Sequence, residues 1–219
     1  PVVSVDTSGY DGSWTSGDVT FTLDSTHKLD GVKYYYNING GEWTEMNGNT
    51  LTVSESTNAA YAFKSVNSAG IESYSTQSYA VKIDKTVASF NLVQDVTEIT
   101  NQSYCVKITD LQVGISGVKA VYLNGDAIDS QSEFTVTQNG EYTVKVVSNS
   151  LLESEKTIKI ENIDTQKPTV TEVTVAHKDT KDFARLVNKM TFGLFFNKTT
   201  QLTVKAEDEG VAGVDRIEY

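Results

Sequence analysis

One short pattern occurs three times in this chain of 219 residues, and it restricts the possible folds more than any other feature. Each copy has an alternating apolar–polar run, then an acidic turn, then a Gly-Val pair that opens the next run. The pairs begin at Gly31, Gly117 and Gly213, so successive copies lie 86 and 96 residues apart. A repeat of this size matches an immunoglobulin-type sandwich, which takes about 100 residues.

The runs alternate with a period of two residues, which is typical of β-strands that bury one face. They occupy residues 19–23, 51–53, 61–64, 79–83, 134–136, 142–146, 157–160 and 202–206. Asn-Gly pairs begin at Asn39, Asn47, Asn124 and Asn139, and Asn-Gly favours the type I′ turn of a β-hairpin. Only residues 180–188 suit a short helical turn. The sequence therefore predicts an all-β fold of tandem immunoglobulin-like antiparallel β-sandwiches.

Two short acidic links divide the copies, Ile-Asp-Lys-Thr at 83–86 and Ile-Asp-Thr-Gln-Lys-Pro at 163–168. We therefore expect one sandwich at 1–87, a second at 88–165, and the N-terminal part of a third at 166–219. The third copy stops inside its expected third strand, so we expect an incomplete domain and a fragment of a longer protein. Residues 177–196 have no counterpart in the other copies. The links hold β-branched residues or Pro rather than Gly-Ser runs, which predicts stiff joints.

The charge and composition exclude several classes of protein. Asp and Glu number 29 against 18 Lys and Arg, which gives a formal net charge of -11. Such a chain repels phosphate backbones and anionic lipid, so we expect no nucleic-acid partner and no binding to a membrane surface. No apolar run approaches the roughly 20 residues that span a bilayer, so we also expect no membrane insertion. The aromatic share of 10% is too high for a disordered acidic chain.

The residues that could support nucleophilic catalysis are scattered. His27 and His177 are far apart in the sequence, and Cys105 lies near neither. A catalytic triad needs a base held against its nucleophile, and no Gly-x-Ser-x-Gly, His-Glu-x-x-His or Walker motif is present. Two carboxylates can also support hydrolysis, but the repeat explains most of the Asp and Glu residues as turn caps and solvated faces. Cys105 follows Tyr104, which is predicted to point into the core of the sandwich. Cys105 is therefore expected to face outward as a lone thiol. We therefore expect no enzymatic activity and no catalytic residues.

The acidic links leave a choice between two roles for Asp84 and Asp164. Calcium takes six to eight oxygen ligands, and carboxylates between tandem sandwiches can supply them. Aspartate also caps turns through its own side chain, and no EF-hand spacing is present. We favour the turn cap and expect no cofactor; calcium at these two aspartates is the alternative.

Four aromatic residues stand in or beside predicted loops or on a strand face, namely Tyr10, Trp14, Tyr35 and Trp43. Exposed flat rings framed by polar side chains can stack on sugars, so these four residues are candidates to face a ligand. The structural alternative, which we favour, is that Trp43 covers the hairpin at 39–41 and Trp14 closes the end of the sandwich.

Three features together resemble a known family: the Gly-Val strand starts, Tyr61 and Tyr142 at the start of two strands, and the Asp-Lys-Thr and Asp-Thr-Gln-Lys-Pro links. They resemble the tandem bacterial immunoglobulin-like (or fibronectin type III-like) repeats of Gram-positive cell-surface and secreted proteins. The resemblance covers nearly the whole chain.

The resemblance implies a non-catalytic extracellular module, either secreted or on the cell surface or cell wall. It would act as a spacer, a stalk or an adhesive segment. Its partners would be neighbouring repeats of the same chain, and a glycan or a host surface protein is a further option. The alternative is a carbohydrate-binding β-sandwich module of a larger carbohydrate-active enzyme.

Overall fold

The computed structural model describes residues 2–26, 31–178 and 199–218. Within these ranges the chain forms strands and no helix, which confirms the all-β prediction. All of the alternating runs fall in strands. The strands are β1 Val3–Asp6, β2 Val19–Ser25, β3 Lys33–Ile38, β4 Thr44–Glu45, β5 Thr50–Val53, β6 Thr57–Val66, β7 Glu72–Tyr74, β8 Tyr79–Ile83, β9 Ser89–Gln94, β10 Tyr104–Gln112, β11 Val118–Leu123, β12 Asp126–Ile128, β13 Glu133–Val136, β14 Gly140–Ser148, β15 Glu153–Ile160, β16 Thr169–Lys178 and β17 Thr199–Glu207.

The chain divides into two compact units. One comprises Pro1–Val93, Val106–Phe134 and Glu141–Ile158, and the other comprises Gln94–Cys105, Thr135–Gly140 and Lys159–Tyr219. The predicted domain boundaries near 87 and 166 do not follow this division, and they stay a prediction. No strand residue occurs at positions 84–88 or 164–168, where the acidic links were placed.

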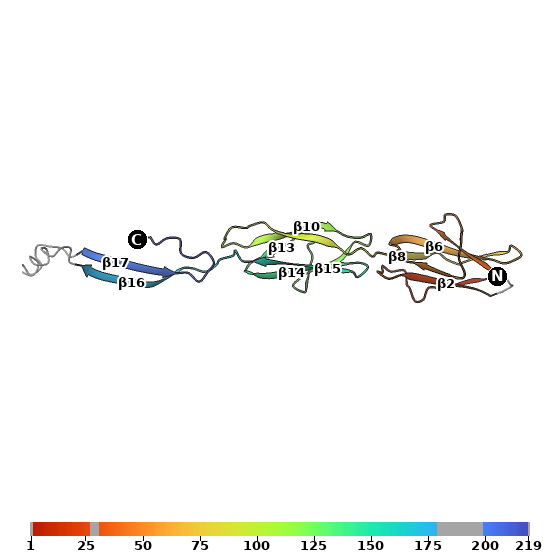
Figure 1. The fold of residues 1–219 in the computed structure, drawn as a ribbon, viewed down its shortest axis with the longest axis horizontal. Coiled ribbons are helices and arrows are strands. Elements are labelled where there is room, and N and C mark those ends of the chain that lie inside the picture. The colour runs from red at the N-terminus through yellow and green to blue at the C-terminus, as the bar shows by residue number, and fades with distance from the viewer. Residues whose placement is uncertain (1, 27–30, 179–198, 219) are drawn as a thin grey trace, which may run out of the picture. The chain divides into compact units, whose positions relative to one another are not determined.

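Strands β1–β8 form two antiparallel sheets that face each other, and we call them the first sandwich (Figure 1). One sheet has the order β1-β2-β5, and the other has the order β4-β3-β6-β7 with β8 also paired to β6. Their inward residues form one buried cluster. Phe21 of β2 is fully buried in it, and its ring lies 4.9 Å from Phe63 of β6, centroid to centroid. The period of two thus determines which face of each strand enters the core.

Strands β9–β15 form two further sheets, with the orders β13-β10-β9 and β12-β11-β14-β15, and we call them the second sandwich. Along β10 the buried residues are Tyr104, Val106 and Ile108, as predicted from their alternation. Cys105 points to the other side and is a free thiol, with its Sγ 3.9 Å from Oγ1 of Thr135.

Among the described residues, strands β16 and β17 pair only with each other, and most of their large apolar side chains are exposed. Val173, Val175 and Leu202 are all more than half exposed, whereas the same alternation is buried in the first two sandwiches. The strand predicted to follow Gly213 is not formed, which corrects that prediction. A strand needs a hydrogen-bonding neighbour, and the described residues provide none at this position. The predicted helical turn at 180–188 lies outside the described residues.

Two of the four Asn-Gly pairs make the predicted hairpins and two do not. Asn39 and Asn124 have φ values of 53° and 51° and are followed by glycines with positive φ, as a type I′ turn requires. They connect β3 to β4 and β11 to β12, which are paired strands. The pairs at Asn47 and Asn139 instead connect strands of different sheets. Asn139 bonds the backbone of Ile163 through both its amide nitrogen and its oxygen, each at 2.9 Å.

A buried serine hydroxyl without a partner gives a stability prediction. Oγ of Ser65, on β6, has no hydrogen-bond partner in the described part of the chain, although the residue is fully buried. Burying an unpaired hydroxyl costs about 1–3 kcal/mol, so Ser65→Ala should raise the free energy of unfolding by about 1 kcal/mol. Denaturant unfolding followed by tryptophan fluorescence measures the change.

The control is Ser75→Ala. Oγ of Ser75 accepts the N–H of Phe63 at 3.2 Å and donates to the carbonyl of Gln77 at 2.9 Å. Its loss should lower the free energy of unfolding by about 1 kcal/mol. If both substitutions changed stability with the same sign, the bonding assigned to these two hydroxyls would be wrong.

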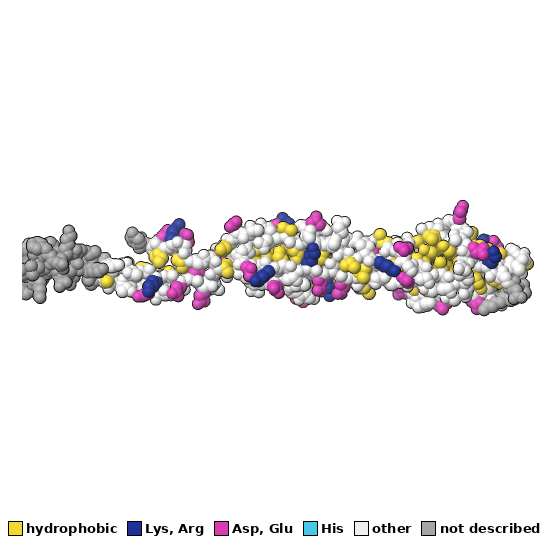
Figure 2. Space-filling model, viewed as in Figure 1, with side chains coloured by type: hydrophobic (Ala, Val, Ile, Leu, Met, Phe, Trp, Pro, Cys, Tyr) yellow, Lys and Arg dark blue, Asp and Glu magenta, His cyan; other side chains and the backbone are white. Residues whose placement is uncertain are grey.

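Among the described residues, no helix is long and apolar enough to cross a membrane. Acidic and basic side chains are intermixed on the described part of the face in view, with no large region of one sign (Figure 2).

Candidate functional site

Three aromatic rings surround the ammonium group of Lys64. Its Nζ lies 5.0 Å from the ring centroid of Trp43, 5.4 Å from that of Tyr35 and 5.8 Å from that of Tyr74. Glu72 Oε1 pairs with the same Nζ at 2.8 Å, and the Lys64 side chain is only 12% exposed. We call these five residues the Lys64 cluster.

Strand register assembles the Lys64 cluster. On β6, Lys64 lies directly opposite Tyr35 of β3 and Tyr74 of β7. Its neighbours on β6, Phe63 and Ser65, point into the core, so Lys64 and its partners occupy the outer face. The sequence placed Trp43 and Tyr35 among the candidate ligand-facing residues but missed Lys64, because a single strand does not show which residues pair across the sheet.

In the Lys64 cluster, Lys64 and Glu72 each stabilise the charged form of the other. The hydrogen bond to Glu72 raises the pKa of Lys64 above its ordinary value, and the hydrogen bond from Lys64 lowers the pKa of Glu72. Tyr74 donates its hydroxyl to Glu72 as well. The cation therefore stays protonated in the neutral range and remains bound against the rings.

This arrangement bears on sugar binding. Trp43 and Tyr74 meet edge to face, with centroids 5.7 Å apart and an interplanar angle of 65°. A flat platform for sugar stacking needs coplanar rings with free faces. Here Lys64 lies over one face of each of the three rings. The cluster is thus an intramolecular cation–π site, and ligand binding by Trp43 and Tyr35 stays a prediction.

The second sandwich carries a reduced form of the same arrangement. Lys145 Nζ lies 5.3 Å from the ring centroid of Tyr122 and pairs with Glu153 Oε1 at 3.4 Å. Lys145 is paired across β14 and β11 with Tyr122, as Lys64 is paired with Tyr35. The lysine–glutamate–tyrosine group is therefore part of the repeat, and Trp43 and Tyr74 are additions of the first copy.

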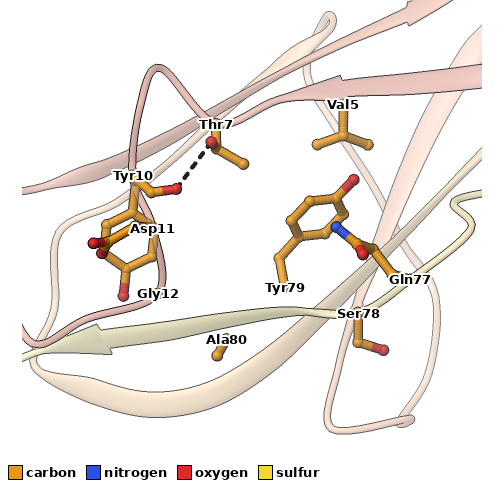
Figure 3. Close-up of a pocket in the computed structure, with 9 residues that line it drawn as sticks. All are labelled: Val5, Thr7, Tyr10, Asp11, Gly12, Gln77, Ser78, Tyr79 and Ala80. Atoms are coloured by element: carbon orange, nitrogen blue, oxygen red, sulfur yellow. Dashed lines mark hydrogen bonds between the residues drawn. The ribbon is translucent and has the colours of Figure 1, made fainter.

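Tyr10 lies beside a separate cleft, between the β1–β2 connection and β8 (Figure 3). Its hydroxyl accepts the backbone N–H of Lys82 at 2.8 Å, and burial raises its pKa. Thr7 Oγ1 donates to the Tyr10 carbonyl at 3.0 Å. The cleft has a volume of about 420 Å³, and Tyr79, Asp11 and other polar residues also line it. Two tyrosines framed by polar groups could hold a small polar ligand such as a sugar.

Trp14 occupies the same connection and is half-buried. The next residue, Thr15, forms a parallel bridge to Ile83, with Thr15 N–H bonded to the Lys82 carbonyl at 3.0 Å. Tyr10 and Trp14 therefore lie at the β1–β2 connection, and Tyr35 and Trp43 lie in the Lys64 cluster. The structure does not bring all four predicted aromatic residues into one site.

Asp84 and Asp164, the predicted turn-cap or calcium residues, occupy equivalent buried positions. They are 0% and 7% exposed. The backbone N–H of Asp84 donates to Thr15 at 2.9 Å, and that of Asp164 donates to Thr100 at 2.8 Å. Each threonine also forms a parallel bridge to the isoleucine that precedes the aspartate.

Both carboxylates accept the N–H two residues further along the link. Oδ1 of Asp84 accepts that of Thr86 at 3.0 Å, and Oδ1 of Asp164 accepts that of Gln166 at 2.9 Å. These are the bonds of an Asx turn, as the turn-cap interpretation requires. Within the described residues, no three His, Cys, Asp or Glu residues form a group that could hold a metal ion. Calcium at these aspartates stays a prediction.

Comparison with known proteins finds no matching family model and no matching curated protein. Among solved structures, the chain is similar to the fibronectin(III)-like modules of Clostridium thermocellum CbhA, with 16% identity and a TM-score of 0.32 over 72% of this chain and 92% of that one. It is also similar to the central fibronectin-III array of RIM-binding protein, with 12% identity and a TM-score of 0.27 over 82% of this chain and 74% of that one. With TM-scores this low, the fold assignment rests on the sheets described above.

Proposed function

We propose that this chain is a non-catalytic extracellular spacer or stalk segment of a bacterial cell-surface or secreted protein, built from repeats with ordered joints. The observation that carries the proposal is the set of backbone hydrogen bonds that both links share. Each of the first two copies ends in a threonine–isoleucine bridge and a buried aspartate that turns the chain. A linker without a structural role has no need to bury a charged group twice in the same way.

The outer faces support the same function. The rings best suited to stack on a ligand hold the chain's own lysine, so their role is to stabilise the sheet. In a tandem array each repeat contacts only the repeats beside it, so the stiffness of a stalk depends on its joints. Joints that resist bending therefore suit a spacer.

Distance measurements test the ordered joint directly. Nitroxide labels are attached at Asn58→Cys on β6 and Glu155→Cys on β15, both exposed positions, in a Cys105→Ser background. A narrow distance distribution is expected, as from a stiff joint. A distribution as broad as that of a flexible linker would contradict the spacer function.

A carbohydrate-binding module is the second candidate, and the cleft beside Tyr10 and Tyr79 is the observation that favours it. A glycan array with the intact protein, Tyr79→Ala and Trp43→Ala separates the two functions. The spacer proposal expects no glycan to be retained by any of the three. Retention that Tyr79→Ala abolishes and Trp43→Ala preserves would establish the cleft as a sugar site.

A further inference from the structure

A glycine contacts each buried link aspartate. A Cβ atom at Gly114 would lie 2.2 Å from both carboxylate oxygens of Asp84. A Cβ atom at Gly210 would lie 2.1 and 2.3 Å from those of Asp164. No side chain fits at such distances. Neither glycine has a positive φ, so the backbone conformation does not explain why glycine occurs at these positions.

The two glycines begin matching four-residue turns, Gly-Ile-Ser-Gly at 114–117 and Gly-Val-Ala-Gly at 210–213. The last glycine of each turn has a positive φ, 73° at Gly117 and 68° at Gly213. In both turns the third residue points its backbone N–H at the carboxylate. Ser116 N–H reaches Oδ2 of Asp84 at 2.8 Å, and Ala212 N–H reaches Oδ2 of Asp164 at 2.6 Å.

The difference between the turns identifies which parts are essential. Ser116 adds a second bond from its hydroxyl to Asp84 Oδ2 at 2.6 Å, and Ala212 has no hydroxyl to add. The features that the two turns share are the open space at the first glycine and the N–H of the third residue. The serine hydroxyl strengthens the first site and is not required to form it.

We propose that the turns at 114–117 and 210–213 are carboxylate-binding sites, whose ligand is the link aspartate of the preceding copy. The first glycine of each turn admits the carboxylate, and the N–H of the third residue binds it. The sequence pattern is therefore an Asp in the link followed, in the next copy, by Gly-x-(Ser/Ala)-Gly. This pattern specifies how one copy docks on the next. The N–H groups that line such turns suit an anion, because their dipoles point inward.

Hydrogen exchange of the full chain tests the first site. In Gly114→Ala the amides of Thr86 and Ser116 should exchange at least about tenfold faster, because the carboxylate that accepts them is displaced. The matched control is Gly17→Ala, which also lacks a positive φ and whose Cβ would lie 3.4 Å from Thr15 Oγ1, an ordinary contact. Equal exchange at Thr86 and Ser116 in the two variants would overturn the proposal.

Asp84→Asn preserves the shape and removes the charge, so it provides a second test if Gly114→Ala does not fold. An amide side chain offers one acceptor oxygen in place of two, so at least one of the Thr86 and Ser116 amides should lose its protection. Protection of both amides at the level of the unaltered chain would contradict the assigned binding. Ser116→Ala, which copies the second turn, keeps both carboxylate oxygens, so it should leave the Thr86 and Ser116 amides better protected than the amide that Asp84→Asn exposes.

A double-mutant cycle separates a local clash from general destabilisation. Trypsin cleavage after Lys85, relative to cleavage after Lys64 in β6, reports opening of the link. Gly114→Ala should raise this ratio about tenfold in the unaltered chain and leave it unchanged in an Asp84→Ala background, where the carboxylate is gone. Equal rises in both backgrounds would show that the glycine does not act through Asp84.

The second site makes an independent test. Gly210→Ala should expose the amides of Gln166 and Ala212 and leave those of Thr86 and Ser116 protected. The inference concerns the same link aspartates as the proposed function, but the two can fail separately. Glycan binding at the Tyr79 cleft would remove the spacer proposal and leave the docking sites intact, whereas loss of the Asp84–Gly114 coupling would remove the docking sites alone.

Discussion

Replacing Phe21 with alanine should lower the free energy of unfolding of the first sandwich by about 3–5 kcal/mol. Phe21 is fully buried, and its ring lies within 6.1 Å of Tyr61, Phe63 and Tyr79, centroid to centroid. Its removal leaves a cavity between the two sheets that rigid neighbouring strands cannot fill. This loss of stability exceeds the contribution of a polar contact on the surface, because the Phe21 ring packs against residues of the opposite sheet.

The chain reports this change without a label. Its two tryptophans, Trp14 and Trp43, both belong to the first sandwich, so denaturant unfolding followed by their fluorescence isolates that part. Ile38→Ala is the control, since Ile38 is 42% exposed, and it should cost less than about 1 kcal/mol. A loss below about 1 kcal/mol for Phe21→Ala would mean that the sheets do not share the core described here.

Acid should open the first link before it unfolds the sandwiches. Burial raises the pKa of Asp84, but the hydrogen bonds from Ser116 and Thr86 outweigh burial and hold the pKa below the ordinary 3.8. A carboxylate with a lowered folded pKa stabilises the folded state above its unfolded pKa. That contribution is therefore complete near neutral pH and is lost as the pH falls through the folded pKa, below 3.8.

The measurement is the exchange of the Thr86 and Ser116 amides between about pH 2 and pH 6, corrected for the intrinsic pH dependence of exchange. Protection should fall at least about tenfold at the acid end, while core amides such as those of Phe63 and Val144 remain protected. In Asp84→Asn, at least one of these two amides should show low protection that does not change with pH. A pH-dependent loss of the same size in that variant would assign the titration to another group.

Particular residues show how far the sequence alone could go. The alternation along β2 and β10 predicted their buried faces correctly, because the side-chain period of a strand is a local property. The Asn-Gly signal was right at Asn39 and Asn124 and wrong at Asn47 and Asn139. A turn residue reports its own backbone preference, and it does not report whether the next strand stays in the same sheet.

The candidate sites depended on pairings that no single segment contains. The sequence named Trp43 and Tyr35 as possible ligand-facing residues, and the structure shows their faces against Lys64. It named Asp84 and Asp164 for turns or calcium, and the structure adds the glycines that receive them. Each of these contacts joins residues at least 20 positions apart, so only the folded chain could show them.

By itself, the sequence determined that this protein is built from repeated β units with acidic links, because strand period, turn chemistry and repeat spacing are written in neighbouring residues. Only the tertiary structure showed that the aromatic rings contact a lysine of the same chain. It also showed that each link carboxylate lies against a glycine, where a side chain would clash. Both depend on the distance between atoms that are remote in the chain, and that distance is set by sheet register and packing.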